Sequence, residues 1–141
     1  MEKTTTDLGT SLSKITKIED YLQENASFLQ VPSALNYLKE CAAANNITLA
    51  QLIKASGIER TYGYHLLNGK KGLTRDKALA FAIARELTLK ETNNLLKYAG
   101  FQQLYARSPR DSIIIFGLEN NQSIDDINGS LDTLGYKSLW D

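Results

Sequence analysis

The side chains with the clearest potential for chemistry lie between Thr48 and Lys71, where arginine, lysine, hydroxyl and aromatic residues are interleaved. Six basic side chains against two acidic ones give residues 47–77 a net charge of +4, whereas residues 1–46 and 78–141 each carry −2. The chain as a whole is neutral, with 16 basic and 16 acidic residues. A local excess of positive charge is typical of a surface that contacts phosphate, although solvated surface lysines would give the same count.

The same stretch lacks the residues of a catalytic or metal site. His65 is the only histidine and Cys41 the only cysteine, whereas a zinc site needs several converging nitrogen, sulfur or carboxylate ligands. The segment from Gly63 to Lys71 is only superficially similar to a phosphate-binding P-loop, because its glycines are one residue too far apart and no Ser or Thr follows the lysine. We therefore expect no metal, no cofactor and no enzymatic activity.

Cysteine content and hydropathy bear on the compartment. The single cysteine, Cys41, forms no internal disulfide, and the helical pattern around it places it on a buried face. The N-terminus is polar and rich in threonine, unlike a secretory signal. No apolar run is long enough to cross a bilayer. We expect a cytoplasmic protein with no membrane partner.

The elements that would position the basic stretch are helices. Thr48 and Gln51 form a capping box that begins a helix over residues 48–56. Gly57 supplies the left-handed cap that a tight turn needs, and a second helix follows over residues 60–68. Apolar spacing predicts two further helices, over residues 13–24 and 33–45. The predicted fold class is all-α.

An internal repeat predicts the structure of the second half of the chain. A shift of 35 residues places residues 75–105 on residues 110–140, with seven identical pairs among 31. The capping positions Thr88 and Ser123 also coincide, and a glycine follows the second helix of each copy. Each copy is therefore predicted to be an αα-hairpin. By this repeat the run Ile113–Ile115, which alone would suggest a strand, is predicted to be helical.

Residues 35–89 resemble the Cro/phage-repressor family of helix-turn-helix proteins, often called the XRE type. The resemblance rests on the Gly57-Ile58 turn, on Asn68-Gly69-Lys70 and on the helix that follows Thr74. It implies a five-helix unit in which residues 60–68 form the recognition helix, which lies in the major groove of double-stranded DNA.

The family's roles carry over position by position, and they imply that Thr48 opens a bracing helix near a phosphate. Arg60 would contact either a guanine edge or a phosphate. Three positions differ from the family, since Leu49 stands where the family typically has glutamine, Ile53 replaces an inward-facing alanine and Gly63 replaces a buried valine or isoleucine. The DNA-binding residues that we expect are Thr48, Arg60, Thr61, Tyr62, Tyr64, His65, Asn68, Lys70 and Lys71.

The expected function is sequence-specific DNA binding by a transcriptional regulator, and we expect a homodimer because half-site recognition normally uses two recognition helices. The expected dimer surface lies on the second hairpin and comprises Ile113, Ile114, Phe116, Leu118, Tyr136 and Trp140. The alternative is an adaptor that binds another regulatory protein, without DNA, through Tyr62, Tyr64 and the second hairpin. The expected domains are a mobile tail with an amphipathic helix (1–32), the helix-turn-helix domain with the first hairpin (33–105) and the second hairpin (106–141), which either packs on the first hairpin or dimerises.

Overall fold

The computed structural model of the protein describes residue 18 and residues 33–140. The chain divides into two compact units, residues 1–32 and 33–141, and the fold described below is that of the second unit. The helix predicted over residues 13–24 and the polar tail before it lie, apart from Ile18, outside the described residues.

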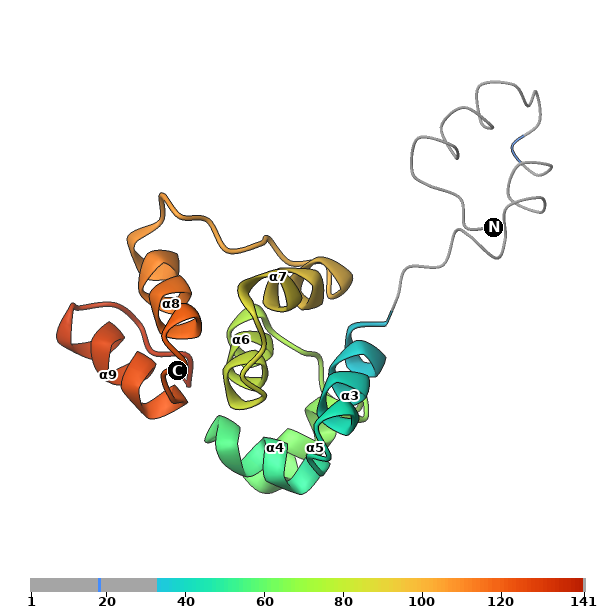
Figure 1. Cartoon of the computed structure of the whole chain (residues 1–141). Helices are drawn as coiled ribbons and strands as arrows, with labels where there is room; N and C mark the ends of the chain where they lie inside the picture. Colours follow the sequence, from blue (N-terminus) through green and yellow to red (C-terminus); the bar gives the residue numbers. More distant parts are fainter. Residues whose placement is uncertain (1–17, 19–32, 141) are drawn as a thin grey trace. The chain divides into compact units, whose positions relative to one another are not determined.

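Residues 33–140 fold into seven helices and no strands (Figure 1). The all-α class is therefore confirmed for this part of the chain. The helices are α3 (Ala34–Ala44), α4 (Leu49–Ser56), α5 (Arg60–Leu67), α6 (Arg75–Ala84), α7 (Leu89–Tyr98), α8 (Pro109–Glu119) and α9 (Ile124–Thr133).

Side-chain caps begin these helices where the sequence predicts them. The capping boxes at Thr48 and Thr88 are present, and a third lies at Ser123, each satisfying two backbone amides at a helix start. Ser108 caps α8 with Pro109 in its first turn. The isoleucine run Ile113–Ile115 lies inside α8, so its predicted helical state is confirmed.

The internal repeat is confirmed by matching bonds. Arg75 Nε donates to the Gln102 carbonyl at 3.0 Å, and Arg110 Nε donates to the Lys137 carbonyl at 3.0 Å. The donor and the acceptor of the second bond each lie 35 residues after those of the first. The side-chain oxygen of Asn93 accepts the Leu104 amide and that of Asn128 accepts the Leu139 amide, again 35 residues apart. We call the helix pairs α6–α7 and α8–α9 hairpin B and hairpin C.

A third copy precedes these two and was missed in the sequence. We call the helix pair α3–α4 hairpin A. In each of the three hairpins the two helices are joined through a residue with positive φ. These residues are Asn46 (58°) in hairpin A, Glu86 (58°) in hairpin B and Asn121 (53°) in hairpin C. The next amide in each copy bonds to a carbonyl five residues back: Ile47 to Ala42, Leu87 to Ala82 and Gln122 to Gly117. The shift of 35 residues did not reveal this copy, because its connecting residue Asn46 lies 40 positions before Glu86 of hairpin B.

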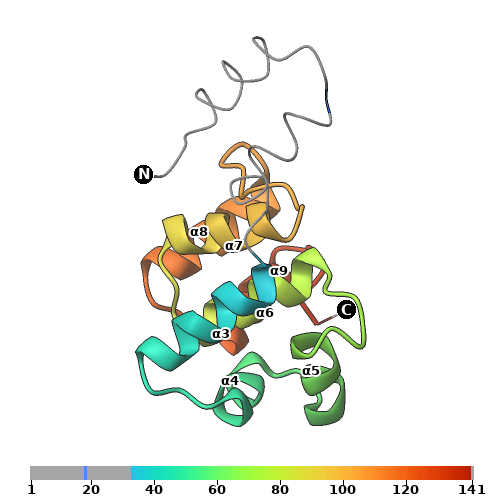
Figure 2. The ribbon, with the colours of Figure 1, turned by 90° about the vertical axis from the view of Figure 1, so that its right-hand side faces the viewer.

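The three hairpins form a stack with hairpin B in the middle (Figures 1 and 2). On one side α3 packs on α7 and α4 on α6; on the other side α6 packs on α9 and α7 on α8. At both interfaces the first helix of one hairpin meets the second helix of the other. Residues 106–141, which we expected as a separate segment, therefore lie in the same compact unit as residues 33–105.

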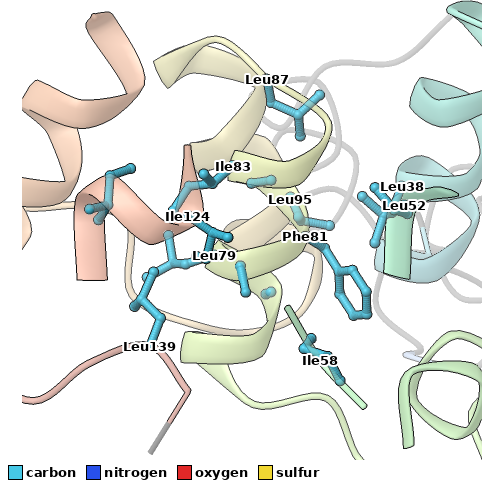
Figure 3. Close-up of a cluster of buried hydrophobic side chains, with 14 of the residues drawn as sticks. Leu38, Leu52, Ile58, Leu79, Phe81, Ile83, Leu87, Leu95, Ile124 and Leu139 are labelled. Carbon is cyan, nitrogen blue, oxygen red and sulfur yellow. The ribbon is translucent and has the colours of Figure 1, made fainter. Parts of the chain in front are cut away.

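Helix α6 forms the centre of the core. Its residues from Ala78 to Ala82 are fully buried. Figure 3 shows Phe81 on the side of Leu52 and Ile58, whereas Leu79 and Ile83 lie toward Ile124 of hairpin C. The alternating alanines explain how helices can approach α6 on two sides, since small side chains allow close packing.

Candidate nucleic-acid interface

Helix α4 begins with a polar cap whose groups are satisfied within the chain. The Thr48 hydroxyl oxygen accepts the Gln51 amide at 3.1 Å, and the Gln51 side chain accepts the Thr48 amide at 2.9 Å. Thr48 is exposed, but its side chain already serves the helix. Any anion at this helix start would therefore meet the neighbouring amides of Leu49 and Ala50 and the positive end of the helix dipole.

The turn between α4 and α5 is fixed by the backbone conformation of Gly57 and by the hydrogen bonds of Ser56. Gly57 has φ +75°, the left-handed conformation that the sequence predicted. The buried Ser56 hydroxyl donates to the Ile53 carbonyl at 2.6 Å and accepts the Ile58 amide at 3.2 Å. These bonds fix the direction in which α5 leaves the turn.

Trp140 covers this turn from the other end of the chain. Its Nε1–H donates to the Ser56 carbonyl at 3.0 Å, and its ring occupies the space where a side chain at Gly57 would lie. The Trp140 carbonyl accepts Lys77 Nζ at 2.9 Å. The sequence contained no signal for this contact, because it joins residues 84 positions apart.

Gly63 lies on the buried face of α5, directly against Ile53 of α4. A Cβ atom at Gly63 would come within 2.6 Å of Ile53 Cγ2, closer than any real contact. The large side chain of Ile53 and the missing side chain of Gly63 are therefore complementary in volume on the facing helices α4 and α5. Glycine costs helix propensity here, but it allows α4 and α5 to pack closely.

The outer face of α5 displays most of the predicted contact residues. Arg60, Thr61 and Asn68 are exposed, and the Arg60 guanidinium lies 5.9 Å from the ring centre of Tyr64. Tyr62, Tyr64 and His65 are half-buried, with both tyrosines packed partly against the core. The helix thus presents a guanidinium, a hydroxyl and an aromatic surface together.

Glu59 caps the start of α5 and was not singled out in the sequence. Its carboxylate accepts the Tyr62 amide at 2.8 Å and the Thr61 amide at 3.0 Å. These backbone hydrogen bonds lower the pKa of the Glu59 carboxyl below its ordinary value. A negative charge therefore occupies the amides at the start of α5, where a phosphate could otherwise bind.

Four exposed cations surround α4 and α5: Lys54, Arg60, Lys70 and Lys71. None of the four forms an ion pair within residues 33–140. Arg75 and Lys77, which we counted in the same cluster, bind Asp111 and the Trp140 carbonyl. The positive surface is consequently narrower than the sequence count suggested.

A shallow hollow lies between α4 and the start of α5. Its volume is about 490 Å³. Its floor is apolar and two of the four cations stand at its edge. The lining residues are Ala50, Ile53, Lys54, Gly57, Ile58 and Arg60.

The predicted dimer surface has to be corrected. Ile114 is fully buried and Leu118 is 8% exposed, so both belong to the core of their own chain. Trp140 covers the Gly57 turn, and Ile113 packs against the core. The sequence did not separate the two faces of α8, so the inward-facing Ile114 was assigned to the dimer surface together with the outward-facing Phe116. Phe116 (60% exposed), Trp140 (39%) and Tyr136 (37%) remain at the surface.

Other candidate chemistry finds little support in residues 33–140. Cys41 is half-buried, and burial, together with the nearby Glu91 carboxylate, raises the pKa of its thiol. Within the described part of the chain no three His, Cys, Asp or Glu side chains converge as metal ligands would. None of the helices described here has the length and hydrophobicity needed to cross a membrane.

Comparisons of the chain with protein-family models, with curated proteins and with solved structures found no match. The functional proposal therefore depends on the geometry of α4 and α5 and on the charges around them.

Proposed function

We propose that the protein is a transcriptional regulator that binds double-stranded DNA through α4 and α5, acting as a helix-turn-helix of the Cro/phage-repressor type. The observation that carries the proposal is the outer face of α5. It exposes Arg60, Thr61 and Asn68 beside the half-buried Tyr64 and His65, and side chains of these types read base edges and phosphates.

The charges support the same orientation. Lys54 and Arg60 lie on one side of this face, and Lys70 and Lys71 follow the end of α5. Cations at both ends of a recognition helix can contact the two phosphate backbones that border the major groove. Thr48 would bring the start of α4, with its helix dipole, to one of these backbones.

Two measurements test the proposal in order. Chromatin pulldown of the full chain from its own cells identifies bound fragments, and fluorescence anisotropy measures their affinity across a salt series. We expect affinity to fall steeply with salt. Lys70→Ala should weaken binding to all duplexes and reduce the log–log salt slope by about 0.9 if it contacts one phosphate. Arg60→Ala should weaken binding by about 1–3 kcal/mol if it contacts a guanine.

Lys97→Ala is the matched control for these variants. Lys97 is exposed on α7 and forms no ion pair among the described residues. Its loss should leave both the affinity and the salt slope unchanged. If the protein retains no fragment even at low salt, or if Lys97→Ala weakens binding as much as Lys70→Ala, DNA binding through α4 and α5 is wrong.

A second candidate, a protein-binding adaptor, is favoured by one specific observation. The Glu59 carboxylate occupies the amides at the start of α5, and it would repel phosphate there. The apolar hollow with Lys54 and Arg60 at its edge would instead suit a peptide that combines apolar and acidic residues. Lys70→Ala separates the two functions, because Lys70 does not line the hollow: its loss should weaken DNA binding but should leave the binding of an acidic peptide through the hollow unchanged.

A further inference from the structure

Within residues 33–140, the stack of hairpins leaves one face of hairpin C uncovered. Two reciprocal ion pairs join hairpins B and C: Arg75 with Asp111, at 2.9 Å, and Arg110 with Asp76, at 3.0 Å. Because the partners exchange roles across the interface, the two hairpins are related by a local twofold axis and meet through equivalent faces. Their opposite faces are therefore also equivalent. On hairpin B that opposite face is covered by hairpin A.

Equivalent residues on these opposite faces differ sharply in exposure. Phe81 of hairpin B is fully buried, whereas Phe116, 35 residues later, is 60% exposed. Tyr98 of α7 packs edge-on against Tyr37 of α3, with ring centres 5.2 Å apart. Its counterpart on α9, Thr133, is exposed. Hairpin C thus has the surface that would receive another hairpin, without one in the described part of the chain.

A hollow marks the position on α9 where α3 lies on α7. Its volume is about 490 Å³, and it is lined by Asp125, Asp126, Gly129, Ser130, Thr133 and Leu134. The first five of these residues lie 35 positions after residues of α7, the helix that α3 covers, and Leu134 lies 35 positions after Ala99, the C-cap of α7. Leu134 in this lining is 62% exposed. Gly129 leaves the floor of the hollow open, because it has no side chain.

Hairpin C also carries the group that could fill such a hollow. The capping residues Ser33 and Thr48 of hairpin A correspond to Ser108 and Ser123 of hairpin C, in each case 75 residues later. By the same shift, Cys41 corresponds to Phe116. Cys41 lies on the side of α3 that faces α7, near Glu91. If hairpin C packed on another hairpin as hairpin A packs on hairpin B, Phe116 of α8 would therefore point into that other hairpin, as Cys41 of α3 faces α7.

We propose that the occupant is a second copy of the chain, and that hairpin C forms a twofold symmetric homodimer in which Phe116 of each copy enters the Gly129 hollow of the other. A twofold interface needs a surface that carries both a projection and its complement. Hairpin C has both, and hairpins A and B already pack in this way within one chain. The proposal does not depend on DNA binding, because the oligomeric state is measured without DNA.

Sedimentation velocity of the full chain over the micromolar range tests this dimer. The wild-type protein should sediment as a dimer, and Phe116→Ala should weaken dimerisation about tenfold or more. Gly129→Leu should do the same by filling the hollow, and it is compatible with the folded monomer because a Cβ at Gly129 meets nothing within 4 Å. Tyr105→Ala, which removes a 50% exposed aromatic from the link between hairpins B and C, should leave the dimer intact.

Mixing the two variants gives a sharper result. Phe116→Ala keeps an intact hollow and Gly129→Leu keeps an intact Phe116, so an equimolar mixture restores one of the two contacts. The mixture should dimerise more strongly than either variant alone. Thermal unfolding of each variant confirms that it is folded. A wild-type monomer throughout the range, a dimer that both variants leave unchanged, or a mixture no stronger than its components would overturn the proposal.

Discussion

Gly63 shows how a residue that weakens its own helix can be required by the next one. Its lack of a side chain accommodates Ile53, whose Cγ2 would lie 2.6 Å from an added Cβ. We predict that Gly63→Ala destabilises the protein by about 1–3 kcal/mol, because overpacking a buried contact outweighs the gain in helix propensity of about 1 kcal/mol. Urea unfolding of the variant measures the difference.

The double variant tests whether Ile53 is the cause. Shortening Ile53 to alanine removes the Cγ1 and Cγ2 atoms that an added Cβ would meet. Alone it should cost about 2–5 kcal/mol, but in the Gly63→Ala background it should cost less. Gly129→Ala is the matched control, because it adds the same methyl group to a helix where nothing lies within 4 Å. It should stabilise the monomer. If Gly63→Ala also stabilises the protein, the close contact between α4 and α5 is not the reason for the glycine.

Single residues of this kind are the least predictable from sequence. The sequence identified Gly63 and Ile53 as separate departures from a family pattern, but their complementary volumes become evident only when α4 lies against α5. Trp140 is a stronger case, since nothing local relates it to Ser56. The polar residues on the outside of α5 were predictable because helical periodicity alone separates them from the buried Leu66 and Leu67.

At the scale of elements, the local signals that begin and end helices were sufficient. The capping boxes at Thr48, Thr88 and Ser123 lie at the starts of three helices, because each is formed within one turn of the chain. The pairing of hairpins was only partly predictable. The repeat identified the conserved Arg-Asp pair of each copy, but it did not show that each arginine binds the aspartate of the other copy.

These reciprocal ion pairs should not contribute equally. Asp111 has a side chain 9% exposed and also accepts the Tyr105 amide, whereas the side chain of Asp76 is 19% exposed. We predict that Asp111→Asn costs about 2–3 kcal/mol and Asp76→Asn about 1–2 kcal/mol, since removing one partner strands an arginine that is partly desolvated. Chemical denaturation at neutral pH measures both.

An exposed carboxylate provides the comparison for this pair. Asp132 on α9 is exposed and forms no ion pair among the described residues, so Asp132→Asn should change the unfolding free energy by no more than about 0.5 kcal/mol. Replacing Arg75 in the Asp111→Asn background should cost less than in the wild type, because the ion pair is already broken and only the bonds to the Gln102 and Gln103 carbonyls remain to be lost. Equal and additive losses at Arg75 and Asp111 would mean that the two side chains stabilise the fold independently.

At the scale of the molecule, the stack of three hairpins has no internal boundary at residue 105. Hairpin B shares its core with A on one side and with C on the other, since α6 packs on both α4 and α9. Trp140 extends this connection, because it belongs to the end of hairpin C but contacts the turn that follows α4. Trp140 thereby links hairpin C to the turn from which α5 begins.

We predict that residues 33–141 unfold in a single cooperative transition. Trp140 is the only tryptophan, so its fluorescence reports whether hairpin C is docked on the Gly57 turn, whereas far-UV circular dichroism reports all helices together. The two signals should give the same midpoint in urea, because undocking hairpin C would expose the core side of α6. A fluorescence transition that precedes the loss of helix would instead make hairpin C an independent domain, as the sequence had suggested. Asp76→Asn should move both midpoints down together, since it removes one reciprocal ion pair but keeps the bonds from Arg110 to the Lys137 and Ser138 carbonyls that precede Trp140.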